Sequence, residues 1–278
     1  MRWLGNFVSR LALSGRIGLA LVVFWLLLAI FGPLLAPHEV GSIVADDVFA
    51  PLSLDFPLGS DYLGRDMLSR VLYGTHFTVG LALAAALAAS SLGTSIALFA
   101  TVSGRWIDEL VSRAMDTLIS IPSKIFALVM VAAFGSSVPL LLLTAALTYL
   151  PGAFRIARAL AVNLNTMDYV QVARVRGEGR VYIACVEILP NMIHPILADF
   201  GLRFMFVVLL LSGMSFLGLG VQPPDADLGS LVRENISGLG EGAPAVVMPA
   251  LAIAMLTIGV NLLIDNLPRG NARSGAEH

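Results

Sequence analysis

The sequence predicts an all-α membrane protein with six transmembrane helices, from its composition, its long apolar runs and its arginine distribution. Hydrophobic residues make up 57% of the 278 positions and charged residues only 13%, whereas soluble domains carry about 25% charge. The mean hydropathy is +0.85. A net charge of −2 argues against nucleic acid as a partner, and the single cysteine, Cys185, allows no internal disulfide. The composition therefore argues against a soluble enzyme and against a disulfide-stabilised scaffold.

The first span is predicted at residues 17–36, after a cytoplasmic N-terminal segment, 1–16, that contains arginines and no acidic residue. About 20 apolar residues are needed to cross the hydrocarbon core of a bilayer. A secretory signal peptide also has a basic start, but its apolar stretch is shorter and a small-residue cleavage site follows it. No such site follows this run, so we expect a retained membrane anchor.

Five further spans are predicted from apolar runs, the second of the six inside the charge-free stretch 71–104 and the others at about 110–134, 138–159, 188–213 and 244–266. The charge-free stretch 125–154 is long for one helix and short for two, so the Gly-Ser-Ser-Val-Pro turn at 135–139 is taken to divide it. The second span carries small residues that are either ordinary filler or a face for close helix packing: Gly80, Ala84, Ala88 and Ser91.

Arginine placement sets the orientation of these spans. With the division at 135–139, the cytoplasmic segment 155–187 contains Arg155, Arg158, Arg174, Arg176 and Arg180. The segments placed outside are instead rich in Asp and Glu. Because basic residues favour the cytoplasmic side of short loops, both termini are predicted in the cytoplasm.

The segments between the spans complete the expected organisation. A periplasmic loop at 37–75 is expected to contain an amphipathic helix over 61–74, with Ser60 as its N-cap. The side of that helix turned toward the membrane would carry Leu63, Met67, Val71 and Leu72. The rest is a five-helix core at 76–267, a cytoplasmic loop at 160–187, a periplasmic loop at 214–243 and a cytoplasmic tail at 268–278.

The sequence contains no pattern for catalysis. No nucleotide-binding G-x-x-x-x-G-K-[ST] run, no H-E-x-x-H zinc pattern and no G-x-S-x-G nucleophile pattern occurs. The four histidines are far apart and lack metal-ligand spacing. We therefore expect no catalytic residue, no metal site and no ATPase site in this chain, and we expect its function to reside in surfaces and in a path through the membrane.

The loop between the fourth and fifth spans is predicted to form a short helix. Tyr169, Val172 and Ala173 would share one face of it, and Gly177 and Gly179 would end it. Such a projection can fit a groove on a partner protein. The alternative is a basic segment attracted to anionic lipid, and composition alone favours that alternative.

Three segments of the sequence resemble motifs of ABC importer permeases. Gln171-Val172-Ala173, followed after three residues by Gly177, resembles the E-A-A-x-x-x-G coupling motif. Residues 57–70 resemble the P-L-G-T-D-x-x-G-R-D-x-x-S-R block of the dipeptide/oligopeptide/nickel family, and residues 215–224 resemble its S-F-L-G-L-G-x-Q-P-P segment. From about residue 15 to residue 270, the chain is similar to the C-type subunit of that family.

The resemblance implies a type I ABC importer permease fold in the bacterial inner membrane. It implies a permease subunit of an ATP-driven importer for peptides or related small solutes. The partners would be a second, different permease subunit, two ATPase subunits that bind ATP and Mg²⁺, a periplasmic solute-binding protein and the lipid bilayer, and no nucleic acid. This chain would need no cofactor. A secondary transporter driven by an ion gradient is the alternative, although no internal repeat supports it.

By the same resemblance, the loop 168–180 would contact the ATPase subunits. The residues expected to do so are Gln171, Ala173, Arg174, Gly177, Glu178 and Arg180. Gln171 stands where the family usually has Glu, so Glu178 is the alternative source of an acidic contact.

Three charges fall within predicted spans. Asp199 and Arg203 are four residues apart, which puts them on one helix face; mutual neutralisation is the simpler interpretation. Lys124 follows Pro122, where a kink could open room. Because charges inside a membrane usually pair or line a polar cavity, the second hypothesis is that Lys124, Asp199 and Arg203 line the path. Lys124 and Arg203 would then meet an anionic group on the solute.

Overall fold

The computed structural model describes residues 11–266. Residues 1–10 of the predicted N-terminal segment and the predicted tail at 268–278 lie outside the described residues. Within the described range the chain is helical apart from its loops, with two isolated β-bridges and no strand.

The membrane-spanning helices follow the predicted plan. The described part has five helices long and apolar enough to cross a membrane, namely α2 (Leu13–Leu35), α3 (Met67–Ser103), α6 (Val138–Asn165), the continuous helix Arg180–Phe216 and α11 (Pro244–Asp265). A bent pair, α4 (Arg105–Ile119) and α5 (Ser123–Phe134), makes a sixth span if the two are counted as one. The predicted all-α class with six spans is confirmed.

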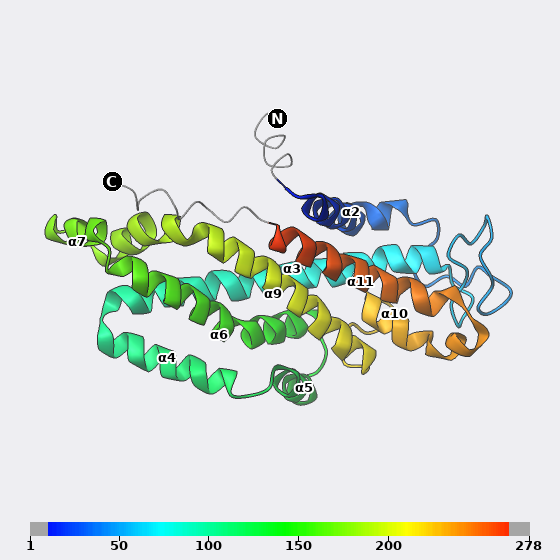
Figure 1. The fold of residues 1–278 in the computed structure, drawn as a ribbon. Helices are drawn as coiled ribbons and strands as arrows, with labels where there is room; N and C mark the ends of the chain where they lie inside the picture. The colour runs from blue at the N-terminus through cyan, green and yellow to red at the C-terminus, as the bar shows by residue number, and fades with distance from the viewer. Residues whose placement is uncertain (1–10, 267–278) are drawn as a thin grey trace.

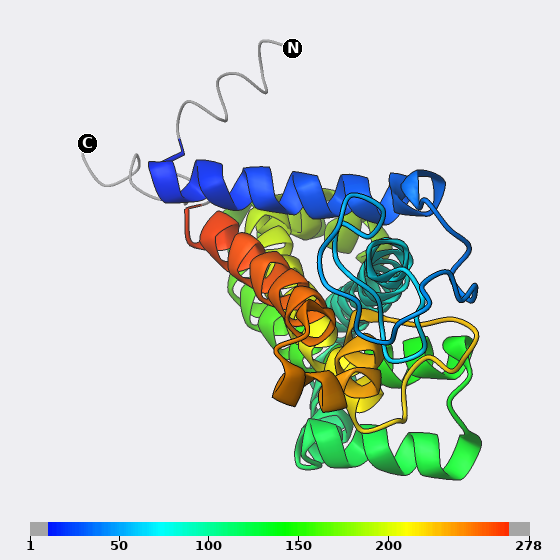
Figure 2. The ribbon, with the colours of Figure 1, turned by 90° about the vertical axis from the view of Figure 1, so that its right-hand side faces the viewer.

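The helices α4 and α5 meet at 82°, so the single third helix predicted at 110–134 is wrong. Ser120 ends α4, and Pro122 stands immediately before α5. Proline has no backbone N–H to donate, and it disfavours the helical conformation in the residue before it. The α4 helix runs alongside α6, whereas α5 turns across the bundle: it is seen end-on in Figure 1 and lengthwise in Figure 2.

Small side chains let α3 pack closely against α6. The buried small residues on α3 include Ala82, Ala85, Ala86, Ala89 and Gly93. A Cβ atom on Gly93 would lie 2.7 Å from the Ala153 Cβ atom, so only glycine fits there. Of the two interpretations of Gly80, Ala84, Ala88 and Ser91, the structure favours ordinary filler within this chain, because Gly80 and Ser91 are exposed. An alanine-rich helix offers several such faces, and contact with α6 selects one of them.

The α2 helix lies across α3 and α11 rather than parallel to them, as a comparison of Figure 1 and Figure 2 shows. It begins at Leu13, before the predicted start at 17. Its buried side contains mostly small residues, with Trp25 as the one large side chain among the buried ones. The opposite side of α2 is exposed and apolar, as expected for a helix in contact with lipid.

At the opposite end of the bundle from the 37–66 loop, α7 (Asp168–Val175) forms the predicted short helix (Figure 1). The chain then passes through α8 (Arg180–Tyr182) and the π-helix η1 (Ile183–Ile188) directly into α9 (Leu189–Phe216). The loop predicted at 160–187 is therefore shorter, spanning 166–179. The α6 helix continues past residue 159 because Ala161 packs in a small core together with Val170 and Ala173.

The amphipathic helix predicted over 61–74 is wrong in its start and in its cap. The α3 helix begins at Met67, and its N-cap is Asp66, which accepts hydrogen bonds from the backbone of Leu68 and Ser69. Ser60 is buried in the loop instead, where its hydroxyl accepts from the Ala50 N–H at 2.8 Å. The predicted loop 37–75 therefore ends at 66. On the face predicted to contact lipid, three of the four residues are buried in the protein: Met67, Val71 and Leu72.

The chain between α9 and α11 folds back on this loop. It contains α10 (Leu228–Glu234) and the 3-10 helix η2 (Ile236–Glu241). Leu228 and Leu231 are fully buried in the main core. The α10 helix therefore packs as part of the bundle, close to the start of α3.

Candidate functional site

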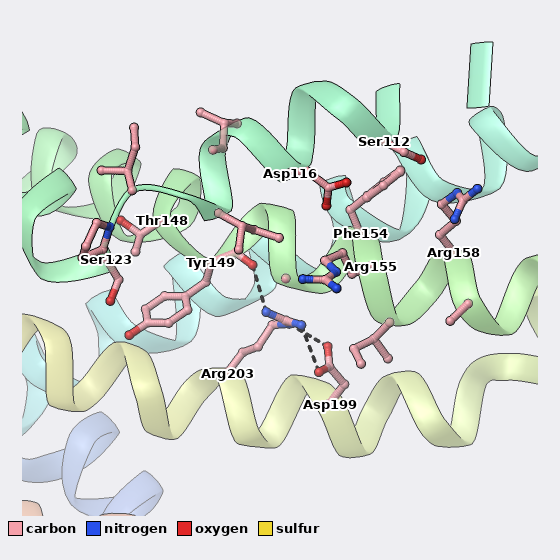
Figure 3. Close-up of a pocket in the computed structure, with 17 residues that line it drawn as sticks. Ser112, Asp116, Ser123, Thr148, Tyr149, Phe154, Arg155, Arg158, Asp199 and Arg203 are labelled. Atoms are coloured by element: carbon pink, nitrogen blue, oxygen red, sulfur yellow. Dashed lines mark hydrogen bonds and ion pairs between the residues drawn. The ribbon is translucent and has the colours of Figure 1, made fainter. Parts of the chain in front are cut away.

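A cavity of about 900 Å³ lies between α4, α6 and α9 (Figure 3). Apolar side chains of the α4–α5 break form part of its wall, together with Phe154 from α6. Its polar lining residues are Ser112, Asp116, Ser123, Thr148, Tyr149, Arg155, Arg158, Asp199 and Arg203. Charged groups within an apolar bundle need partners or water, so this cavity is the candidate for a polar path.

Asp199 and Arg203, two of the three residues predicted to line the path, both line the cavity, but they bind each other. The Arg203 Nε and Nη2 atoms lie 2.6 and 3.0 Å from the Asp199 carboxylate oxygens. The Arg203 Nη1 atom donates to the Tyr149 carbonyl at 2.9 Å. A Cβ atom on Gly152 would lie 2.8 Å from that nitrogen, so the glycine makes room for the guanidinium. This geometry favours mutual neutralisation of the pair.

A second ion pair joins α4 to α6. The Arg158 Nε and Nη2 atoms donate to the two carboxylate oxygens of Asp108 at 2.6 and 2.5 Å. Two parallel bonds between a guanidinium and a carboxylate fix orientation as well as distance. No residue of α4 is fully buried, although Val111 and Met115 pack partly buried against the small core, so this pair adds a polar attachment of α4 to the bundle.

Asp116 and Arg155 also line the cavity, from α4 and α6 respectively. Their side chains point into the space between the two helices from opposite sides (Figure 3). Within residues 11–266, neither side chain forms an ion pair or a side-chain hydrogen bond. The cavity therefore holds one cation and one anion without a direct ion pair or side-chain hydrogen bond in the described chain, although the charge of Asp116 also acts on Arg158 at longer range.

Lys124, the third predicted path residue, does not line this cavity. It is exposed near the start of α5, and its neighbour Ser123 lies in the wall instead. The sequence analysis missed Asp116, Arg155 and Arg158 as cavity residues. A signal was present in α6, where Thr148, Gly152, Arg155 and Ala159 recur at helical spacing and all line the cavity.

Four charged residues, two of them buried and two half-buried, form a cluster at the end of the molecule that carries the 37–66 loop. The Asp61 carboxylate lies 2.6 Å from Arg65 and 2.6 Å from Arg70, and Glu234 lies 3.2 and 2.8 Å from the same two arginines. We call Asp61, Arg65, Arg70 and Glu234 the outer clamp. It ties the 57–70 segment to α10.

The α7 helix is anchored on one side and open on the other. Val170 and Ala173 are fully buried in the small core, whereas Val172 and Val175 are exposed. Of the three residues predicted to share one face of this helix, only Ala173 is buried, whereas Tyr169 and Val172 are exposed. The open side and the following turn form what we call the α7 surface, which includes Gln171, Val172, Arg174, Val175, Arg176, Arg180 and Val181.

The turn after α7 is built on Gly177. Its φ of +83° lies in the left-handed region, which glycine adopts without steric cost. The Gly177 N–H donates to the Arg174 carbonyl at 2.9 Å, and the Glu178 N–H donates to the Ala173 carbonyl at 3.1 Å. These two bonds are the Schellman pattern that ends helices at a glycine.

Residues 89–273 match the family described as "Binding-protein-dependent transport system inner membrane component". The chain belongs to this family. The match includes α4 to α11, and so both the cavity and the α7 surface of this permease.

Full-length relatives of the permease extend the comparison. A putative peptide transport system permease protein of Brucella suis is 32% identical over 91% of this chain and 86% of its own length. A di/tripeptide transport system permease protein of Pseudomonas aeruginosa is 30% identical over 92% and 86%. A dipeptide transport system permease protein of Alkalihalophilus pseudofirmus is 29% identical over 90% and 83%. The resemblance drawn from the sequence motifs is confirmed, and a permease subunit is favoured over a secondary transporter.

The residues predicted to contact the ATPase subunits of such a permease differ in how exposed they are. Gln171 and Arg174 are exposed and hold the chain entering α7: Gln171 Nε2 donates to the Asn165 carbonyl at 3.1 Å, and Arg174 Nη2 to Asn165 Oδ1 at 2.7 Å. Arg180 is exposed and Glu178 is half-buried. Ala173 is fully buried, so it can anchor α7 but cannot touch a partner protein as predicted.

Proposed function

We propose that this permease forms half of the solute path of an ATP-driven importer for peptides or related small solutes. The peptide permeases among its relatives support the solute class. The observation that carries the proposal is α7, a helix that projects from one end of the bundle and is anchored to it by Val170 and Ala173.

The proposed partners follow from this arrangement. A second permease subunit completes the path, two ATPase subunits bind ATP and Mg²⁺, and a periplasmic binding protein delivers the solute. The permease has no ATPase site of its own. The arginines on and around α7 support a cytoplasmic α7 surface, with both termini on the same side of the inner membrane.

In this proposal, Gln171, Arg174, Gly177, Glu178 and Arg180 lie at the contact with the ATPase subunits. Nucleotide binding moves those subunits, and α7 moves with them. Because Val170 and Ala173 pack in one core with residues of α6, η1 and α9, a displacement of α7 must shift the cytoplasmic ends of these helices. A ligand that binds one state better than the other then drives alternating access.

Purification and transport together test the proposal. A tagged chain purified from its native host should bring down a second permease and ATPase subunits. In proteoliposomes that contain ATP, the complex should import radiolabelled L-alanyl-L-alanine when the binding protein is present outside. Import by the isolated chain, driven by an ion gradient without ATP, would contradict the proposal.

A further inference from the structure

We propose that Arg155 and Asp116 form a binding site for a zwitterionic solute inside the cavity, with Arg155 taking a carboxylate and Asp116 an ammonium group. This inference rests on the proposed function and deepens it, because it assigns the solute contact to two residues. It also moves that contact away from Lys124 and Arg203, where the sequence suggested it.

The charges around the cavity support this assignment by elimination. Arg203 is matched by Asp199, and Arg158 is matched by Asp108, each through two hydrogen bonds. Arg203 is 7% exposed, and its remaining hydrogen bond goes to a backbone carbonyl. These four charges are structural and have little capacity left for a ligand.

The remaining two charges are placed differently. Arg155 and Asp116 are exposed, they stand on different helices, and they point into the same space (Figure 3). They form no ion pair with each other or with another described residue. Two charges of opposite sign that face one cavity without a direct ion pair or side-chain hydrogen bond can be satisfied together by one molecule that carries both signs.

The chemistry of the two groups fits the two ends of a peptide. A guanidinium donates two parallel hydrogen bonds to a carboxylate, and charge-assisted bonds of this kind are the strong ones. A carboxylate accepts hydrogen bonds from a terminal ammonium group. A cavity of about 900 Å³ falls within the range of small-molecule sites. Thr148 and Tyr149 lie nearby in the wall and offer uncharged polar contacts.

Asp116 and Arg155 lie on two different helices, α4 and α6, so their separation depends on how these helices are placed relative to each other. Asp116 is on α4, which has no fully buried residue and is held to α6 through Asp108 and Arg158. A movement between α4 and α6 would change the separation of Asp116 and Arg155. Such a change would release a molecule held at both ends, as alternating access requires.

Charge-removing variants of the complete importer complex test the inference. Arg155→Gln and Asp116→Asn should each lower ATP-dependent uptake of radiolabelled L-alanyl-L-alanine by about tenfold, because each loses one charge-assisted contact. Stimulation of ATP hydrolysis by the loaded binding protein should remain. Arg155→Lys should recover part of the uptake. Lys124→Gln, which removes an exposed cation outside the cavity, is the matched control and should transport normally.

Each other outcome has a distinct meaning. If Arg155→Gln and Asp116→Asn leave the uptake of dipeptide per ATP hydrolysed unchanged, the proposed binding site is overturned. Loss of the second permease from either variant complex also overturns it, since the charges would then belong to the contact between subunits. Wild-type import of a neutral disaccharide but not of the dipeptide overturns the site while an ATP-driven importer stands. Uptake without ATP overturns the proposed function itself.

Discussion

The guanidinium of Arg70 and the carboxylate of Asp61 form an ion pair of 2.6 Å in which neither residue is more than 1% exposed. The same Arg70 nitrogen lies 2.8 Å from Glu234 on α10. Buried charges of this kind are tolerated only when they are matched. The outer clamp therefore fixes the 57–70 segment and α10 to the start of α3.

Removing one partner of the outer clamp should destabilise the protein strongly. Arg70→Met leaves two carboxylates, one of them buried, with only Arg65 to match them, at a cost of about 3–5 kcal/mol. The expected result is a clear fall in the melting temperature of the purified complex. Arg113→Met is the control, because the Arg113–Glu109 pair has side chains that are 76% and 48% exposed and such pairs contribute about 0–1 kcal/mol. Equal melting temperatures for the two variants would rule out a stabilising clamp.

Asp227 should make stability depend on pH in a direction opposite to that of most carboxylates. Its side chain caps α10 by accepting from the Ser230 N–H at 2.8 Å, and it also accepts from the Ser215 hydroxyl. Burial raises the pKa of Asp227 above its usual value of 3.8, although these hydrogen bonds oppose the shift. The folded state therefore binds this proton more tightly than the unfolded state does. Its contribution is complete below pH 3.8 and is lost as the pH rises through the raised pKa.

The Asp227→Asn variant isolates this effect. Asparagine keeps the capping oxygen but does not ionise. The wild type should lose stability relative to Asp227→Asn as the pH is raised above about 4, measured as the difference between their melting temperatures. Asp227→Ala should be less stable than Asp227→Asn at every pH, because it loses the cap. A temperature difference between wild type and Asp227→Asn that is flat with pH would show that Asp227 does not titrate in this way.

Five of the six spans could be predicted because each contains one long local apolar run, whereas the bend that divides the remaining span into α4 and α5 was not predicted. The partners of buried charges could not be predicted either. Arg158 and Asp108 are 50 positions apart, and nothing in either local sequence indicates the other. The cap of α3 illustrates a second limit, since Ser60 and Asp66 are both good capping residues. The choice is made by contacts of the folded loop, in which Ser60 is already engaged by Ala50.

Gly177 should be more sensitive to substitution than Gly179. Gly177 has a φ of +83°, and a Cβ atom there would meet open space, so the cost of Gly177→Ala is backbone strain of about 1–2 kcal/mol. Gly179 has a φ of −72°, which any residue adopts. Gly177→Ala should therefore lower transport per ATP hydrolysed, and Gly179→Ala should not.

Two further variants separate backbone strain from steric blocking at Gly177. Gly177→Asn should be milder than Gly177→Ala, because asparagine tolerates the left-handed conformation. Gly177→Trp should uncouple ATP hydrolysis from transport, because its side chain would project into the space where we propose that the ATPase docks. Normal transport by Gly177→Trp would argue against a coupling role for this turn.

The Asp108–Arg158 pair should help to hold α4 in place, because α4 has no fully buried residue of its own. Asp108→Asn and Arg158→Gln should each loosen α4, and hydrogen exchange of residues 105–119 should rise several-fold in either variant. The exchanged pair Asp108→Arg/Arg158→Asp puts the same charges on opposite helices and should recover part of the protection. Arg113→Gln, on the same helix but in an exposed pair, is the matched control and should leave exchange unchanged. If α4 stays fully protected in both single variants, its position depends on other contacts, with the second permease as the first candidate.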